Sequence, residues 1–256
     1  MIQNLVLLTR PSLECLPLAG ALHRAGIASM VEPMLEILYR TPEKTGPKKV
    51  CFSGVILTSQ HGLKGMLRCF PHVPRKTPVY CVGSVTAQHA LHAGFKNVHV
   101  AAGAAVHLQQ LIQGQMRAQA MSAEAPLFYP RGQEIRLNLK DQLATQGIVV
   151  EECIVYEAKP VAALSEHLLD TIRKGAVKVV ALYSKRTAET FLKLIKEAGY
   201  APFQGVVLVA SEDIASLFRG GHSGSIVFID PEDIDTVVKA CVNLGLSIAH
   251  TDVRVS

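Results

Sequence analysis

Two arginines in this sequence follow predicted β-strands, at positions where a side chain can bind an anionic ligand. Arg10 follows the apolar run Leu5–Leu8, and Arg131 lies in a predicted tight turn, Pro130-Arg131-Gly132, after a second apolar run. Both positions predict the carboxyl end of a β-strand, the edge where open α/β sheets bind ligands. A guanidinium group there can form paired hydrogen bonds with a carboxylate. Two such arginines facing one cleft would suit carboxylate ligands.

Hydroxyl-bearing residues follow four further predicted strands. A serine at such a position can cap the next helix or bind a ligand, and capping is the more common role. The strand ends match in pairs between the two halves of the chain: Thr58-Ser59 with Tyr183-Ser184, and Gly83-Ser84 with Ala210-Ser211.

The segment Gly83-Ser84-Val85-Thr86 offers a second kind of anion site. It has neither the GxGxxG spacing of a dinucleotide site nor the GKS or GKT of a P-loop. Its small residues still place backbone N–H groups at a helix N-terminus, which favours anions.

Other reactive residues fit structural roles better. His89 and His92 stand three apart on one predicted helix without a third ligand at suitable spacing, so we expect a solvated helix face. The six cysteines form no CxxC pair, and no HExxH, GxSxG or paired-acid motif occurs. The predicted chemistry is therefore metal-free.

Composition excludes several classes of partner. The chain has 256 residues, 49% of them hydrophobic, and a net charge of +5 without a basic run, so nucleic acid binding is not indicated. No apolar run approaches the roughly 18–20 residues that span a bilayer, and no secretory leader precedes the first predicted strand. We expect a cytoplasmic protein with no membrane partner that acts as a monomer.

The elements that must position these residues repeat along the chain. In both copies a strand ends at an arginine, a helix follows, and a glycine sixteen residues after the arginine precedes another strand. The second helix is predicted from the four-residue spacing of Ile135, Leu139 and Leu143. The first copy comprises the strand Leu5–Leu8, the turn Thr9-Arg10-Pro11, the helix Leu13–Leu22, Gly26 and the strand Ile27–Val31. Thr9 could cap the helix of this copy. The second copy ends with Gly147 and the strand Val149–Tyr156.

Three more strands are predicted after each copy, interleaved with helices. They lie at 55–58, 79–82 and 97–101, and at 177–183, 206–210 and 226–229. Each half would then need five strands, and this βα alternation predicts parallel sheets covered on both faces. Residues 1–100 and 126–230 could form consecutive domains. Alternatively, the first strand–helix–strand joins the last three strands, and the middle forms an inserted, circularly permuted domain.

Two segments favour the inserted arrangement. Glu36–Arg40 and Ile154–Lys159 alternate apolar and polar residues, which is typical of a half-exposed two-stranded ribbon. They flank the middle segment, where paired linkers would lie. We therefore predict two doubly wound parallel-sheet domains of flavodoxin or Rossmann type, the second inserted into the first and joined by a two-stranded β linker. The predicted boundaries are 1–38 plus 160–256 for the first domain and 41–157 for the second.

Five motifs in this order resemble the uroporphyrinogen-III synthase family over nearly the whole chain. They are Leu7-Leu8-Thr9-Arg10-Pro11, Leu57-Thr58-Ser59, Val82-Gly83-Ser84-Val85-Thr86-Ala87, Tyr129-Pro130-Arg131-Gly132 and Val155-Tyr156. The resemblance implies a cofactor-free enzyme of two α/β domains. Its substrate would be hydroxymethylbilane, a linear tetrapyrrole with eight carboxylates. The implied reaction expels the hydroxyl at the ring A end, closes the macrocycle and inverts ring D through a spiro intermediate.

The resemblance also implies roles for individual residues. Tyr156 matches the family's cleft tyrosine, a candidate to protonate the departing hydroxyl, and a phenol, with an ordinary pKa of about 10, is protonated at neutral pH. Asp213 falls where the family has a hydroxyl, which puts substrate contact by that stretch in doubt. The expected substrate-binding residues are Arg10, Ser59, Gly83, Ser84, Thr86, Arg131, Gly132, Ser184 and Ser211.

A function of another class is compatible with the same architecture. Two α/β lobes around a cleft also serve non-catalytic binding proteins, here for an anionic metabolite. A phosphorylation receiver is less well supported, because the first strand ends in Thr9-Arg10 and not in an acidic cluster.

Overall fold

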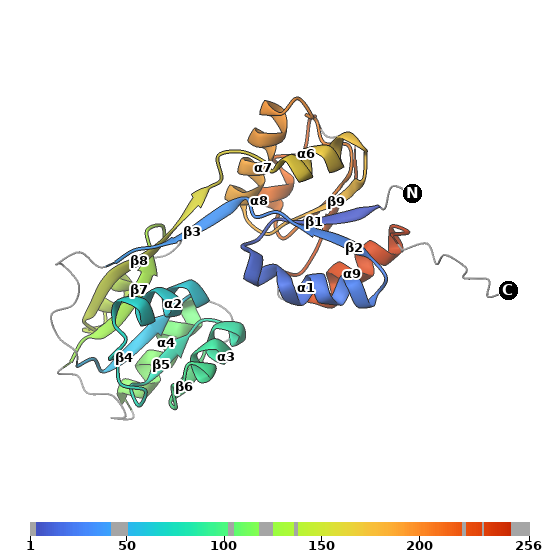
Figure 1. Cartoon of the computed structure of the whole chain (residues 1–256). Helices are drawn as coiled ribbons and strands as arrows, with labels where there is room; N and C mark the ends of the chain where they lie inside the picture. Colours follow the sequence, from blue (N-terminus) through green and yellow to red (C-terminus); the bar gives the residue numbers. More distant parts are fainter. Residues whose placement is uncertain are drawn as a thin grey trace. The chain divides into compact units, whose positions relative to one another are not determined.

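The chain divides into two compact units, each built around a β-sheet of its own. A computed structural model describes residues 4–41, 51–101, 105–117, 125–135, 138–221, 224–231 and 233–246. Unit 1 comprises Met1–Glu36 and Lys159–Ser256, and unit 2 comprises Ile37–Ala158 (Figure 1). Unit 2 is thus an insertion in the sequence of unit 1. Whether each unit folds as an independent domain stays a prediction.

Unit 1 is built on a five-stranded parallel sheet. In chain order its strands are β1 (Leu5–Leu8), β2 (Ala28–Val31), β9 (Val177–Leu182), β10 (Val206–Val209) and β11 (Ile226–Phe228). Their spatial order is β11-β10-β9-β1-β2, and every pairing is parallel. Counted within the unit, this is the 2-1-3-4-5 order of flavodoxin-like sheets. The predicted fold class is confirmed.

Helices cover both faces of this sheet because its strands are apolar on both sides. Val6 and Leu8 pack with α1 (Ser12–Arg24) and α9 (Ile234–Asn243), which lie side by side in Figure 1. Leu7 points to the opposite face, as alternation along a strand requires. That face is covered by α6 (Glu166–Arg173), α7 (Lys185–Glu197) and α8 (Glu212–Ala215).

Unit 2 repeats this plan with a permuted chain. Its sheet contains β3 (Leu35–Tyr39), β4 (Gly54–Leu57), β5 (Val79–Cys81), β6 (Val98–Val100), β7 (Leu127–Gly132) and β8 (Val150–Pro160), in the order β3-β8-β7-β4-β5-β6. Without the edge strand β3, the order matches unit 1 when β7 takes the place of β1. The strand ends matched by sequence therefore occupy equivalent places.

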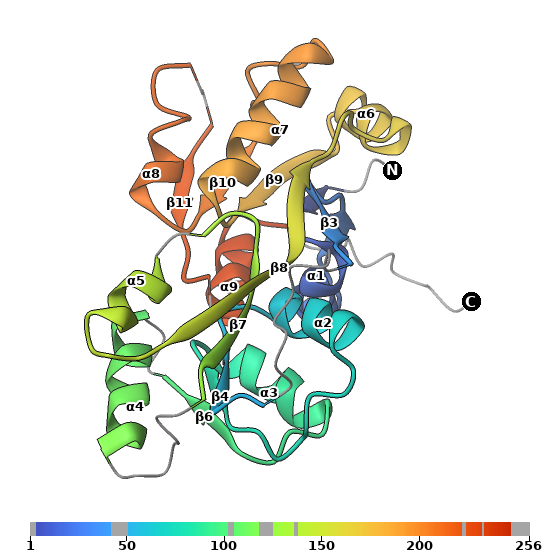
Figure 2. The same cartoon turned by 90° about the vertical axis from the view of Figure 1, so that its left-hand side faces the viewer.

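The helices of unit 2 also divide between two faces. One core cluster joins the sheet to α2 (Gln60–Cys69) and α3 (Ser84–His92). The other joins it to α4 (Ala105–Arg117) and α5 (Leu139–Ala144), on the opposite side of the sheet in Figure 2.

Two local predictions in the second copy are wrong. Pro130-Arg131-Gly132 is not a tight turn, because β7 continues through Gly132 and stays paired with β8. Ile135 is not on the helix, which begins at Leu139 after Asn138 accepts a capping hydrogen bond from the Asp141 N–H. Leu139 and Leu143 are buried as predicted, whereas Ile135 is exposed. Residues 136 and 137, inside the predicted helix, lie outside the described residues.

The predicted linker ribbon is part of a larger sheet. β8 is one continuous strand of 11 residues, and β3 pairs with it, so the sheet of unit 2 has six strands where five were predicted. In unit 1, Thr9 does not cap α1. Its buried hydroxyl donates to the Ala181 carbonyl at 2.6 Å and so ties β1 to β9. Gly26 and Gly147 end their helices as predicted, with φ of 71° and 75°.

Candidate functional site

The candidate site in unit 2 centres on a hydrogen bond between two hydroxyl groups. Ser59 Oγ and Tyr156 Oη lie 3.0 Å apart, and either can be the donor. Ser59 is also the N-cap of α2, where its oxygen accepts from the Gly62 N–H at 3.1 Å. The cap therefore holds the serine beside the tyrosine. Of the two roles that the sequence suggested for Ser59, capping is confirmed and ligand binding stays a prediction.

A β-bulge places Tyr156 at this position. Arg131 pairs with Ile154, but Gly132 pairs with Tyr156, so Val155 is an extra residue in β8. Such a bulge re-aims the side chains that follow it and is common beside active sites. The ring of Tyr156 then lies against Gly132: a Cβ there would approach the ring's Cζ to 2.8 Å and its hydroxyl to 3.0 Å. Gly132 thus makes room for the tyrosine ring.

Two further glycines bring α2 close to these strands. A Cβ on Gly62 would lie 2.7 Å from the Pro130 carbonyl oxygen, and one on Gly65 would lie 2.6 Å from the Val155 side chain. Real Cβ atoms do not approach so closely, hence each position requires a glycine or a shifted helix. This close packing holds the α2 N-terminus, with Ser59, next to Tyr156.

His61 and Tyr39 complete the cluster. His61 is only 8% exposed, and its Nδ1 lies 2.9 Å from the Tyr39 hydroxyl. The rings of His61 and Tyr156 are 5.6 Å apart at a 49° tilt. Arg68, in the last turn of α2, places its guanidinium 4.2 Å from the ring centroid of Tyr39. The site therefore combines two phenols, from β3 and β8, with an imidazole from the first turn of α2 and the serine that caps that helix.

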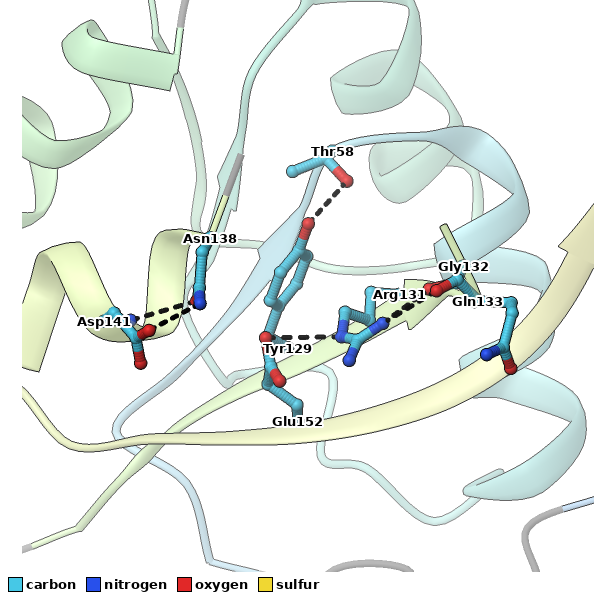
Figure 3. Close-up of polar contacts among 8 residues, drawn as sticks. All are labelled: Thr58, Tyr129, Arg131, Gly132, Gln133, Asn138, Asp141 and Glu152. Atoms are coloured by element: carbon cyan, nitrogen blue, oxygen red, sulfur yellow. Dashed lines mark hydrogen bonds and ion pairs between the residues drawn. The ribbon is translucent and has the colours of Figure 1, made fainter. Parts of the chain in front are cut away.

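Tyr129 forms a second hydroxyl pair at the same edge of the sheet. Its phenol points toward Thr58, with the oxygens 3.3 Å apart (Figure 3). Burial raises the pKa of Tyr129, although the hydrogen bond with Thr58 opposes that shift. Tyr129 is 3% exposed, whereas Tyr156 is half-buried, so Tyr156 is the better placed of the two to meet a ligand.

Arg131 is committed to its own unit. Its Nη1 donates to the Gly132 carbonyl at 2.9 Å, and its Nε lies 3.3 Å from Glu152 Oε1 on the neighbouring strand (Figure 3). Nε and Oε1 are buried, and neither has a well-oriented hydrogen-bond partner among the described residues. Both side chains are less than one-fifth exposed. Arg131 therefore pairs with a carboxylate of its own unit, whether or not it also contacts a ligand.

The other predicted residues of unit 2 lie at the start of α3. Gly83 is its N-cap and Ser84 its first residue, both after the end of β5. Parallel pairing of β4 with β5 and β7 brings these residues to the same sheet edge as Ser59 and Gly132. Thr86 is 8% exposed, so little of its side chain is open to a ligand.

The predicted residues of unit 1 gather at the equivalent edge. Arg10 Nε binds Glu14 at 2.9 Å, and its guanidinium covers the ring of Tyr183 at 4.9 Å. Burial raises the pKa of Tyr183 to about 12, although the Arg10 charge opposes the shift. Ser184 caps α7 by accepting from the Thr187 N–H, as a capping role predicts.

Ser211 occupies the equivalent place before α8. Its hydroxyl caps none of the described residues of that helix, and the side chain is exposed. Asp213 lies in the first turn of α8 and is exposed, where a carboxylate is favourable beside the helix N-terminus. The acidic residue therefore has a structural explanation.

The remaining candidates do not gather into a site. Within the described ranges, no three His, Cys, Asp or Glu side chains are close enough to hold a metal ion. His92 is exposed as expected, while His89 is half-buried, and burial, followed by the nearby Lys64, lowers its pKa. No helix in the described part of the chain is long and apolar enough to cross a membrane.

Sequence reasoning missed the roles of Tyr39, His61 and Tyr129. His61 stands two residues after Ser59, at the start of a predicted helix. Tyr39 lies in a segment that alternates apolar and polar residues, as does the separate segment that contains Tyr156. These signals could have indicated a polar cluster, but they do not show which side chains meet.

Fold and site together define a class of protein: two parallel α/β units, each with polar residues at its carboxyl edge, the second inserted into the first. The family model described as uroporphyrinogen-III synthase HemD matches residues 17–214. The chain therefore belongs to the uroporphyrinogen-III synthase family, whose function is the cyclisation that forms uroporphyrinogen III in haem biosynthesis.

Solved structures agree with this fold. Uroporphyrinogen-III synthetase from Helicobacter pylori is 16% identical, with a TM-score of 0.60 over 94% of this chain and 100% of that chain. A mutant uroporphyrinogen III synthase from Thermus thermophilus is 13% identical, with a TM-score of 0.51 over 94% of this chain and 98% of that chain. A sequence comparison with curated proteins finds no match.

Proposed function

We propose that this chain acts as a cyclising hydro-lyase on hydroxymethylbilane, with Tyr156 as the proton donor. The observation that supports this role is the Ser59–Tyr156 hydrogen bond at a ligand-binding sheet edge. The half-buried phenol is held by Gly132, Ser59 and His61. A fixed donor loses little orientational freedom when the substrate binds, which favours catalysis.

The proposed step moves one proton and one hydroxyl group. The phenol of Tyr156 donates to the hydroxyl oxygen at the ring A end, the carbon–oxygen bond breaks, and water leaves. The electron-rich pyrrole supplies the electron pair that stabilises the resulting cation, so a weak acid is sufficient. Ser59 can donate to the phenolate that forms, because the two oxygens are 3.0 Å apart. General acid assistance of this kind contributes about 10²–10⁴-fold in rate.

Binding of the octacarboxylate is assigned to the two sheet edges. Arg10 is the more available cation, since its side chain is 38% exposed, against 16% for Arg131. The N-termini of α3, α7 and α8, with Gly83, Ser84, Ser184 and Ser211, offer backbone N–H groups and hydroxyls to carboxylates. Gly132 contributes by leaving space for the ring of Tyr156, and Thr86 is a buried residue of α3. We also propose a cytoplasmic monomer that needs no cofactor.

The product isomer tests this function directly. Hydroxymethylbilane generated enzymatically should give mainly the type III isomer of uroporphyrin with the protein and mainly the uninverted type I isomer without it. A boiled sample of the same protein is the control. Unchanged isomer ratios, together with tight binding of the bilane, would instead favour the non-catalytic binding protein for an anionic metabolite.

A further inference from the structure

We propose that His61 and Tyr39 form a positioning pair that fixes the ring of Tyr156 in its working orientation. The inference rests on the proposed function of Tyr156 and adds two residues to it. Neither residue needs to touch the substrate. Their effect would pass through the tyrosine ring.

The contacts of Tyr156 leave few orientations for its ring. Gly132 lies against the ring, with space for a hydrogen atom but not for a Cβ, and Ser59 holds the hydroxyl at 3.0 Å. The imidazole of His61 packs beside the ring at a centroid distance of 5.6 Å and a 49° tilt. Removing His61 would therefore take away one of the groups that pack against the ring.

His61 is itself held in place by Tyr39. Its ring is buried, and burial of a polar ring is costly unless its nitrogen atoms are hydrogen-bonded. The 2.9 Å contact between His61 Nδ1 and the Tyr39 hydroxyl meets that requirement for one nitrogen. Tyr39 is restrained in turn by the Arg68 guanidinium over its ring. An aliphatic residue at position 61 could fill the volume but could not be oriented by Tyr39.

The three rings come from three segments that are far apart in the sequence. Tyr39 belongs to β3, His61 to the first turn of α2, and Tyr156 to β8 just after the bulge. β3 and β8 are neighbours in the sheet of unit 2. The pair therefore ties the edge strand and the helix to the strand that carries the proposed proton donor.

A double-mutant cycle separates positioning from simple structural support. His61→Ala should lower kcat about tenfold with little change in KM, since misplacing a reacting group by about 1 Å can cost up to about 10²-fold. In a Tyr156→Phe background the same change should cost less than about twofold, because coupled residues are non-additive. Tyr39→Phe should show the same dependence more weakly. Exposed His72 gives the control, His72→Ala.

A second variant at position 61 keeps the test valid if His61→Ala unfolds. His61→Phe keeps an aromatic ring beside Tyr156 and removes the nitrogen that meets Tyr39. Its kcat should therefore lie between that of the wild type and that of His61→Ala. Equal losses of kcat for the His61 variants in both backgrounds would overturn the proposal and assign the residue to stability alone.

Fluorine NMR reads the ring position without any assay of activity. In protein labelled with 3-fluorotyrosine, the Tyr156 resonance is identified by its loss in Tyr156→Phe. It should shift or broaden in His61→Ala and Tyr39→Phe, and stay in place in His72→Ala. An unmoved resonance overturns the positioning pair whatever Tyr156 does. A moved resonance with full activity of Tyr156→Phe upholds the pair and rejects the proton-donor role instead.

Discussion

The two units of this protein share a strand order but not the chemistry of their sheet edges. The edge of unit 1 presents a cation, Arg10, over a phenol whose pKa burial raises to about 12. The edge of unit 2 presents a cluster of hydroxyl groups and aromatic rings in which Ser59, His61 and Tyr156 lie together. A duplicated architecture therefore supplies equivalent strand ends, and the side chains at those ends differ between the two units.

The strands β2 and β8, which hold the same place in the two strand orders, also differ beyond their shared part. In unit 1 the residue that follows β2 is Glu32, whose carboxylate accepts hydrogen bonds from the N–H and hydroxyl of Ser165 before α6. The carboxylate thereby fastens the start of a helix. In unit 2 the corresponding strand continues past its bulge and presents Tyr156. The two counterpart strands therefore end differently: β2 is followed by a carboxylate that fastens a helix, and β8 continues to Tyr156 and beyond.

The largest expected effect concerns whether the units are independent. The fragment 41–157 should unfold cooperatively, because it contains nearly all of unit 2. The fragment 1–125 should not, since it lacks β9 and β7, the neighbours of β1 and β4 near the centres of the two sheets. Thermal unfolding followed by circular dichroism distinguishes them. A sharp transition in 1–125 would favour two consecutive domains.

The phenols of the two edges can be compared by removing one hydroxyl at a time. Tyr156→Phe should lower kcat about 10²-fold and leave the type III isomer predominant, as loss of a general acid implies. Tyr183→Phe, the matched change in unit 1, should alter kcat by less than about twofold, corresponding to under about 0.4 kcal/mol. Turnover and isomer ratio are measured for both. Full activity of Tyr156→Phe removes the residue from the mechanism, and a switch to the type I isomer shows that it positions ring D.

The two arginines should differ in what their loss damages. Arg131→Ala leaves the mostly buried Glu152 without its cation, which should cost about 3 kcal/mol of unfolding free energy. Arg10→Ala breaks a half-exposed pair with Glu14 and should cost no more than about 1 kcal/mol. Its main effect should be a rise in KM equivalent to about 1–3 kcal/mol of charge-assisted binding, weaker in high salt. Urea unfolding and steady-state kinetics test each variant. An Arg10→Ala enzyme with unchanged KM would assign that arginine to structure.

The smallest effect expected is that of a single methyl group at two glycines of unit 2. Gly132→Ala would press against the ring of Tyr156, so we expect a loss of about 1–2 kcal/mol in stability, as for other overpacked sites. Turnover should fall with it. Gly83→Ala is the control for stability, because a Cβ there meets no described atom within 4 Å and its φ of −129° suits alanine. Equal behaviour of the two variants would contradict the tight fit of the tyrosine ring.

Local patterns in the sequence predicted most elements of the fold. Apolar runs marked the buried strands because a parallel sheet covered on both faces needs apolar residues throughout. Gly26 and Gly147 were recognisable because the left-handed conformation after a helix favours glycine. The capping roles of Ser59 and Ser184 follow from neighbours three residues away. The matched strand ends do lie at equivalent strands of the two sheets, but the alternating segments Glu36–Arg40 and Ile154–Lys159 were what favoured the permuted arrangement.

Only the tertiary structure decided which of these side chains meet. Ser59 and Tyr156 are separated by 97 residues, and their contact depends on a bulge at Val155 that no local pattern announces. The two arginines have the same spacing to a glycine, yet one binds its own helix and the other a neighbouring strand. Periodicity records which face of an element is buried. The partner of a polar side chain depends instead on strand register and close helix packing, which form only when distant segments come together.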